Sequence, residues 1–236
     1  MTNSKKYIFF FLTAALLMSS GLSQAGDDTQ FLPDFYDKVE PIILVDPLGS
    51  FLGAVNEGET YVYHYADIIK YSGHSCSSIA GAYKMTQIAL KELYGTETPV
   101  RGQIRVTMKG SPEYQVNGPI SQAISFITGA AAETGFKGIK GKFFTRQNLL
   151  KYEPENPPAE GVWAEATFQR TDNNQSVTVT YRTDLIPGNP EMGKLMPVML
   201  SGKANEEQKK LFGEIWQEAV RIALMDPPDG TFVVSK

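Results

Sequence analysis

The side chains best suited to chemistry in this chain lie close together in the sequence. Both histidines, His64 and His74, and the only cysteine, Cys76, fall within thirteen of its 236 residues. Imidazole and thiolate groups bind zinc, copper and iron well. A single cysteine cannot form a disulfide within its own chain. The pattern therefore predicts a metal site in this segment, with His74 and Cys76 as its first two ligands.

The segment around these residues predicts how they are positioned. Gly73 allows the chain to turn just before His74, and the apolar pattern that follows Cys76 predicts a helix. The dipole at a helix N-terminus favours the thiolate form of a cysteine, which suits both metal binding and nucleophilic attack. His64 is the candidate third ligand, if its strand runs beside the start of the helix. The candidates for a fourth ligand are Asp67, Glu113 and a water molecule.

The first residues predict export from the cytoplasm. Two lysines precede the apolar run 7–18, and small residues lead up to Ala25 as signal peptidase requires. The run is shorter than the ~20 residues that span a membrane comfortably. We expect residues 1–25 to be a signal peptide cleaved near Ala25, and the mature protein, 26–236, to be periplasmic or secreted.

Charge and hydropathy make two classes of partner improbable. The formal net charge is −4, and removal of residues 1–25, which carry two lysines and no acid, makes it −6. There is no basic cluster of the kind that binds a nucleic-acid backbone, and no second apolar run long enough to cross a membrane. We expect a metal ion and a small-molecule ligand as partners, with neither nucleic acid nor a membrane span. Arg101 and Gly102, ahead of a predicted strand, could face an anionic ligand.

Hydrophobic periodicity predicts helices and strands in an irregular order. Strands are predicted at 41–45, 60–65, 100–108, 141–145, 162–170, 176–183 and 231–234. Helices are predicted at 67–71, 76–93, from 118 and from 205, the last with an Asn205–Gln208 cap. The prolines of 152–161 predict a loop or a joint. The whole pattern predicts an α+β fold in one domain, with a mixed or antiparallel sheet, two core helices and a C-terminal amphipathic helix.

The stretch from Gly73 to Gly81, GHSCSSIAG, resembles the signature of the FmdE-like family, which is named after a component of formylmethanofuran dehydrogenase. That signature reads roughly His-Gly-His-x-Cys-Pro-Gly, followed by an apolar helix. The resemblance covers about 61–152 and leaves 153–236 as a C-terminal extension. It implies an α+β core, often a homodimer, that holds a divalent metal, zinc first, through its His-x-Cys segment. Only His74 and Cys76 carry over directly.

The segment also departs from the family's signature. Ser72 stands where the first histidine is expected, Ser77 and Ser78 replace the Pro-Gly pair, and the usual cysteine before the second helix is absent. No further cysteine is present to build a zinc finger. The enzyme complex after which the family is named is cytoplasmic and reduces carbon dioxide, and a secreted protein would not meet it. The ligand set is therefore altered, and the activity does not follow from the family's name.

Two other functions fit the same residues. One is a module for haem or copper, with His74 or Cys76 as ligand and the methionines of 192–199 on an irregular flap that could cover the pocket. The usual covalent haem attachment is excluded because the chain has no Cys-x-x-Cys-His motif. The other is a thiol enzyme in which Cys76 attacks a substrate and His74 or His64 serves as the base.

Overall fold

A computed structural model describes residues 29–236, and every helix and strand within that range belongs to the unit Pro33–Lys236. The expected signal peptide, residues 1–25, lies outside the described residues. None of the described helices combines the length and the apolar character that a membrane span requires.

The main sheet has five strands in the order β4-β3-β5-β6-β7. β3 pairs parallel with β4, and the other neighbours are antiparallel, so the sheet is mixed. On β3 the residues Ile104, Val106 and Met108 are fully buried, which is the alternation expected for a sheet covered on one face. The strands are β3 (Ile104–Lys109), β4 (Leu150–Glu153), β5 (Ala164–Arg170), β6 (Ser176–Tyr181) and β7 (Phe232–Ser235).

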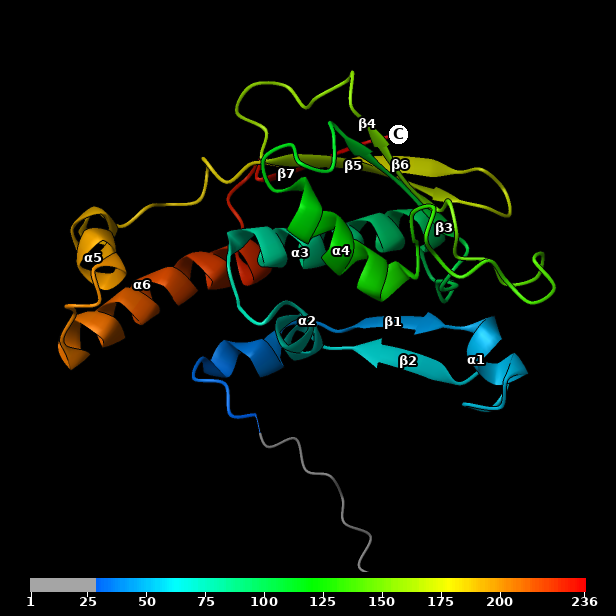
Figure 1. Cartoon of the computed structure of the whole chain (residues 1–236), viewed down its shortest axis with the longest axis horizontal. Coiled ribbons are helices and arrows are strands. Elements are labelled where there is room, and N and C mark those ends of the chain that lie inside the picture. Colours follow the sequence, from blue (N-terminus) through cyan, green and yellow to red (C-terminus); the bar gives the residue numbers. More distant parts are fainter. Residues whose placement is uncertain (1–28) are drawn as a thin grey trace, which may run out of the picture. The chain divides into compact units, whose positions relative to one another are not determined.

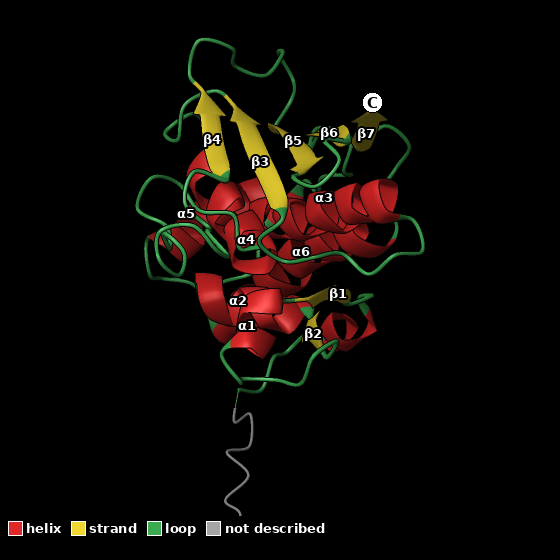
Figure 2. Ribbon diagram, turned by 90° about the vertical axis from the view of Figure 1, so that its right-hand side faces the viewer, coloured by secondary structure: helices red, strands yellow, loops and turns green. Residues whose placement is uncertain are grey.

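Two helices, α3 (Ser77–Tyr94) and α4 (Asn117–Thr128), pack against each other and against this sheet (Figures 1 and 2). Both figures show the sheet on one side of the helix pair. The protein core lies between the two layers, because burial of apolar side chains is the main favourable term in folding. Large fully buried side chains of these elements include Ile79, Met85, Ile120, Ile124, Phe168 and Tyr181.

A smaller layer lies on the other side of the helix pair (Figures 1 and 2). It contains an antiparallel two-stranded sheet with Ile42 paired to Tyr63 and Val45 paired to Thr60. The helix α2 follows this sheet directly in the chain and ends just before α3 begins. The elements of this layer are the 3-10 helix η1 (Asp34–Lys38), β1 (Ile42–Val45), α1 (Pro47–Phe51), β2 (Thr60–Tyr63) and α2 (Tyr65–Ser72).

The C-terminal helices α5 (Glu191–Leu200) and α6 (Glu206–Met225) pack against each other, and α6 also packs against α3. Asn205 caps α6: its side chain accepts from the Gln208 amide at 2.8 Å, and the Gln208 side chain accepts from the Asn205 amide at 3.0 Å. In Figure 1, α5 and the first turns of α6 extend away from the three layers.

The α+β class, the mixed sheet, the two core helices and the C-terminal amphipathic helix are confirmed. Two local predictions are wrong. Residues 141–145 form no strand, because Lys140, Gly141 and Phe144 have positive φ angles of 52°, 66° and 60°, which bend the chain into turns. The methionine segment is the helix α5 rather than an irregular flap. The predicted loop at 152–161 is present from residue 154 onward, after β4 ends at Glu153, and it joins parts of a single unit.

Candidate functional site

The candidate site lies where the chain leaves α2 and enters α3. α2 ends at Gly73, which has φ 75° and ψ 0°, a left-handed conformation that glycine adopts without strain. The Ser72 hydroxyl lies 2.8 Å from the His74 carbonyl oxygen and donates to it, which fixes the turn. Cys76 is the extended residue immediately before α3, with φ −149° and ψ 172°. The glycine turn and the start of α3 therefore place His74 and Cys76 next to each other.

His74 and Cys76 are in direct contact. The Cys76 Sγ atom lies 3.3 Å from His74 Nε2, and His74 Nδ1 lies 3.0 Å from the carbonyl oxygen of Ser72. Because a carbonyl oxygen can only accept a hydrogen bond, Nδ1 is the protonated nitrogen in this contact. In neutral imidazole the lone pair is then on Nε2, on the side of the thiol. Metal-binding histidines commonly have this arrangement, with the second ring nitrogen donating to a backbone carbonyl.

The separation of the two donor atoms suits one metal ion. Zinc bonds of about 2.0–2.1 Å to nitrogen and about 2.3 Å to sulfur, at a tetrahedral angle, would separate the two atoms by about 3.5 Å. The 3.3 Å between Sγ and Nε2 is close to that value. His74 is exposed and Cys76 is partly exposed, so an ion can reach both from solvent. These two residues fit a zinc ion, and they would supply two of its four ligands.

Ser75, between the two candidate ligands, is buried and held by side chains from distant elements. Its hydroxyl shares a 3.0 Å hydrogen bond with the hydroxyl of Tyr65, and its carbonyl oxygen accepts from Trp216 Nε1 at 2.9 Å. Gln217 Nε2 approaches the same carbonyl at 3.5 Å, and its amide oxygen accepts from the Tyr36 hydroxyl at 2.8 Å. The backbone between His74 and Cys76 is therefore fixed from both sides by α2 and α6.

Two aromatic side chains donate hydrogen bonds to the start of α3, beside Cys76. The Tyr181 hydroxyl donates to the carbonyl oxygen of Ser77 at 3.0 Å, and Trp163 Nε1 donates to the Ser78 hydroxyl at 3.2 Å. Burial raises the pKa of Tyr181 well above its usual value, and the negative charge of a Cys76 thiolate adds to the rise. Tyr181 therefore stays protonated and remains a hydrogen-bond donor at neutral pH.

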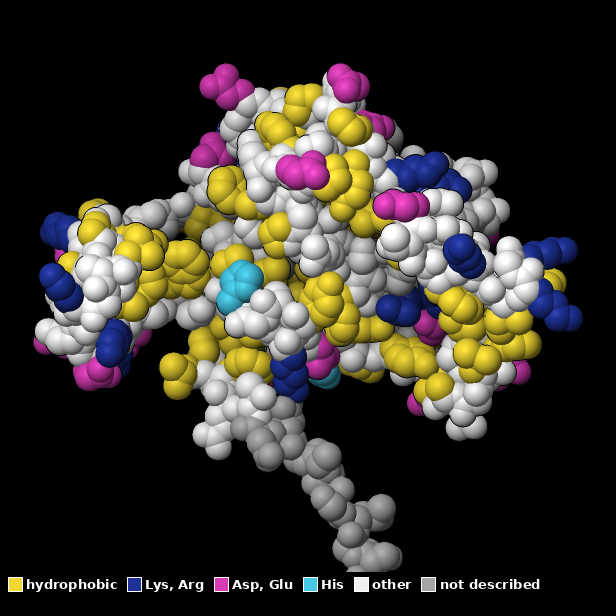
Figure 3. All heavy atoms as spheres, in the orientation of Figure 1, with side chains coloured by type: hydrophobic (Ala, Val, Ile, Leu, Met, Phe, Trp, Pro, Cys, Tyr) yellow, Lys and Arg dark blue, Asp and Glu magenta, His cyan; other side chains and the backbone are white. Residues whose placement is uncertain are grey.

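The structure does not bring the third and fourth candidate ligands to this pair. His64 precedes α2 and His74 follows it, and the eight residues of that helix correspond to a rise of roughly 12 Å. Asp67 lies in the first turn of α2, where its carboxylate accepts from the His64 amide at 2.8 Å. Within residues 29–236 no three side chains of His, Cys, Asp or Glu converge as a metal-binding group, and Glu113 joins none. Figure 3 shows the histidines, in cyan, as two separate areas.

Sequence reasoning found the two contacting residues and missed those that hold them. Trp216 lies in the apolar stripe of α6, and its hydrogen bond reaches across 141 residues of sequence to Ser75. Tyr36 and Gln217 are 181 residues apart. Local patterns do not report such distant pairs. Tyr65 falls at the end of the predicted strand 60–65, and that pattern carries no sign of its hydrogen bond to Ser75.

No curated protein matches this chain. A family model does: the model for FmdE, described as molybdenum formylmethanofuran dehydrogenase operon, matches residues 71–233. The matched region begins just before His74 and Cys76, and it includes α3, α4, the strands β3 to β6 and both C-terminal helices. The match covers more than half of the chain and contains the motif residues at its start, and the chain therefore belongs to the FmdE family.

Proposed function

We propose that this protein is a periplasmic metal-binding protein that holds a divalent ion, zinc first, through His74 and Cys76. The observation that carries the proposal is the 3.3 Å contact between Cys76 Sγ and His74 Nε2, with Nδ1 turned to a backbone carbonyl. A thiolate and an imidazole nitrogen are ligands that zinc prefers. Copper and iron accept the same donors, so the metal has to be identified by measurement.

Two protein ligands leave two tetrahedral positions for other donors. In catalytic zinc sites an open position holds water or substrate, which the metal polarises. The partial exposure of Cys76 and the exposure of His74 suit access by a small-molecule ligand. A second copy of the chain is the other source of ligands, as in the homodimer that the resemblance implies. Sedimentation with and without zinc distinguishes them, because ligands shared between two copies would make dimerisation dependent on the metal.

A thiol enzyme is the second candidate, and the same contact supports it. A cysteine within hydrogen-bonding reach of a histidine has the arrangement of a nucleophile and its base. His74 is then the base, since His64 is at the far end of α2. The two functions differ in what a metal does to the thiol, because a bound ion shares a sulfur lone pair and lowers the nucleophilicity that an enzyme needs for attack.

The rate at which iodoacetamide alkylates Cys76 separates the two candidates. For a metal site, we expect zinc to protect Cys76 strongly, and a chelator to restore alkylation. The protection should disappear in His74→Gln and persist in His64→Gln, which is the matched control for loss of an imidazole. Fast alkylation that neither zinc nor a chelator changes would favour the thiol enzyme and contradict the metal site.

The proposed location rests on the signal-like residues 1–25. Cell fractionation should find the protein in the periplasm or medium, and intact mass should show a chain that begins at Gly26. A cytoplasmic protein that retains Met1 would contradict this part of the proposal and leave the metal site untouched.

A further inference from the structure

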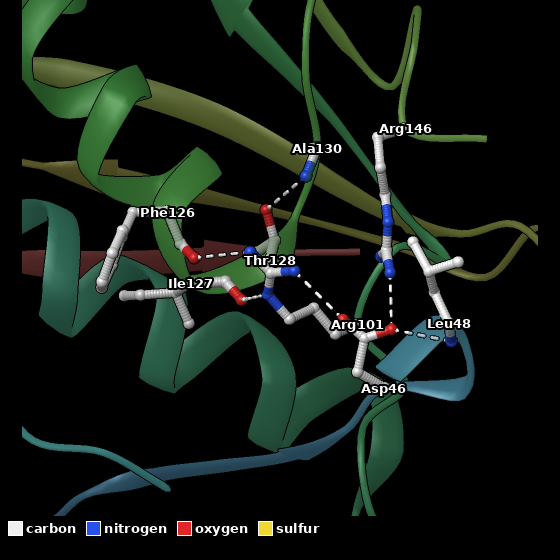
Figure 4. Close-up of polar contacts among 8 residues, drawn as sticks. All are labelled: Asp46, Leu48, Arg101, Phe126, Ile127, Thr128, Ala130 and Arg146. Atoms are coloured by element: carbon white, nitrogen blue, oxygen red, sulfur yellow. Dashed lines mark hydrogen bonds and ion pairs between the residues drawn. The ribbon is translucent and has the colours of Figure 1, made fainter. Parts of the chain in front are cut away.

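A second polar cluster lies at the N-terminus of α1, where Asp46 accepts hydrogen bonds from two arginines (Figure 4). Asp46 Oδ1 lies 2.6 Å from Arg146 Nη2 and 3.0 Å from the Leu48 amide nitrogen. Asp46 Oδ2 lies 3.1 Å from Arg101 Nη1. Figure 4 shows the guanidinium groups reaching this carboxylate from different segments of the chain. One carboxylate therefore serves two cations.

Arg101 has further partners that account for its position. Its Nε and Nη2 atoms donate to the carbonyl oxygens of Ile127 and Phe126, each at 3.0 Å. These carbonyls belong to the last turn of α4, where the helix dipole is negative and favours a cation. Arg101 thus caps α4 and also contacts Asp46, which is sufficient to explain it as a structural residue.

The Arg146 guanidinium bonds to Asp46 but, unlike Arg101, to no helix carbonyl among the described residues. It is only 7% exposed, and its Nη1 atom is one of the buried polar atoms in residues 29–236 that have no hydrogen-bond partner. Gly102 leaves the space for this guanidinium, since a Cβ at that glycine would lie 1.5 Å from Nη1. Burial lowers the pKa of Arg146 although Asp46 opposes the shift. A buried charge with an unused donor is costly unless an acceptor is supplied.

Arg146 also lines a pocket of about 450 Å³, a volume within the range of small-molecule sites. We name it the Arg146 pocket; its walls include Arg101, Gly102, Lys142, Phe143, Phe144 and Arg146. Lys142 is exposed, lies over the Phe143 ring and has no carboxylate partner in the part of the chain that the structure describes. At the right-hand edge of Figure 3, basic and hydrophobic side chains lie beside one another.

We propose that the Arg146 pocket binds a small organic carboxylate. Arg101, Arg146 and Lys142 bring three positive charges, which exceed the negative charges of Asp46 and of the wall residue Asp172. Asp172 already has its own partner, Arg170, at 2.7 Å. The ligand carboxylate is attracted by this excess of positive charge, and Lys142, which is exposed, and Arg101, which is partly exposed, can donate charge-assisted hydrogen bonds to it.

Two phenylalanines in the pocket wall indicate that the ligand also has an apolar part. Phe143 is 51% exposed and Phe144 lies beside it in the pocket wall, in contact with Phe51 at a ring-centroid distance of 5.2 Å. Exposed aromatic rings at a pocket favour a ligand with an apolar ring or chain. Inorganic anions would leave these rings in water, so the expected ligand carries both a carboxylate and an apolar body.

This pocket is separate from the His74–Cys76 pair. Cys76 precedes α3, whereas Arg101 follows the other end of that helix, and Arg170 donates to the carbonyl of Leu93 in its last turn. The 18 residues of α3 correspond to roughly 27 Å. The ligand of the Arg146 pocket therefore does not contact the proposed metal ion, and the two proposals stand or fall independently.

Benzoate is the probe for the test, with benzamide as its neutral counterpart and orthophosphate as an inorganic anion, all at one ionic strength set with chloride. Amide chemical shifts of Gly102 and Phe143 in the purified full-length protein report binding. We expect saturable shifts with benzoate and none with benzamide. Absence of saturation with benzoate, or equal saturation with benzamide, would overturn the proposal. Saturation with phosphate but not with benzoate would overturn the claim that the ligand is an organic carboxylate with an apolar body.

Two exposed residues allow variants that keep the fold. Lys142→Gln should raise the dissociation constant for benzoate about three-fold or more, and Phe143→Ser should raise it likewise. Lys137→Gln is the control, because Lys137 is an exposed lysine on the same loop that does not line the pocket. Arg146→Met should abolish binding, provided that circular dichroism shows a folded protein. Unchanged benzoate affinity in Lys142→Gln and Phe143→Ser would overturn the assignment of the site whatever the state of Arg146→Met.

Discussion

Replacing Asp46 by asparagine removes the only negative charge from a largely buried group of three charges. The side chains of Asp46, Arg146 and Arg101 are 8%, 9% and 23% exposed. Asparagine still accepts from the Leu48 amide, so the α1 cap remains and the loss is confined to the ion pairs. Removing one partner of a buried pair costs about 3–5 kcal/mol. We expect a loss of about 3 kcal/mol, since Arg101 keeps its two α4 carbonyls.

Urea unfolding at pH 7 measures this loss of unfolding free energy directly. In a separate thermal melt, a loss of about 3 kcal/mol corresponds, for a protein of this size, to a fall in melting temperature of roughly 6–12 °C. Glu218→Gln is the matched control, because Glu218 also pairs with an arginine, Arg221, but on the exposed surface of α6. Exposed pairs contribute little to stability, so the control should unfold at the same urea concentration as the wild type.

The pH dependence of Asp46→Asn provides an independent check. Burial alone raises the pKa of Asp46, but the charge of Arg146 and the hydrogen bonds from both arginines outweigh it, so the pKa lies below 3.8. A carboxyl group with a lowered pKa stabilises the fold above its unfolded pKa, and that contribution is lost as the pH falls through the folded pKa. The difference between wild type and variant should therefore be constant near neutrality and shrink below pH 3.8. A difference under about 1 kcal/mol at pH 7, or one that persists unchanged in acid, would refute the reasoning.

Three further substitutions test the packing that positions the site. Trp216→Phe removes the donor to the Ser75 carbonyl and should lower the free energy of unfolding by about 1 kcal/mol. It should also weaken the affinity for zinc. An unchanged zinc affinity would show that this hydrogen bond does not position the ligands. Gly81→Ala places a Cβ 2.2 Å from the Tyr181 ring. Although alanine favours helix, urea unfolding should therefore show a free energy of unfolding lower by about 1–2 kcal/mol. A stabilised variant would contradict this packing. Asn205→Ala removes the α6 cap and should cost about 1 kcal/mol in the same assay, whereas no loss would mean that the cap contributes nothing.

Elements with a strong local pattern could be predicted from the sequence. α6 combines an Asn205 cap with an uninterrupted apolar stripe, and α3 spans Ser77–Tyr94, close to the predicted 76–93. The short elements could not. β4 has four residues and is defined by its pairing with β3, which no local periodicity reports. Phe144 has the apolar character of a strand residue, but its φ of 60° places it in a turn.

The candidate site divides in the same way. His74 and Cys76 are two residues apart beside a glycine turn, so their contact could be predicted from local geometry. The convergence of His64 could not, because its position depends on the length and direction of α2. The Arg146 pocket was visible only in part, through Arg101. Arg146 contacts Asp46 across 100 residues, and no sequence pattern connects them.

The most direct test of the central claim is the metal content of the protein. Mass spectrometry of elements, with a visible spectrum, should be recorded on protein purified without a metal-affinity tag, for the wild type, Cys76→Ser, His74→Gln and His64→Gln. We predict near-stoichiometric zinc or another divalent metal in the wild type and in His64→Gln, and its loss in Cys76→Ser and His74→Gln. A metal-free wild type, metal retained in both site variants, or a Soret band in place of a divalent metal would contradict the account.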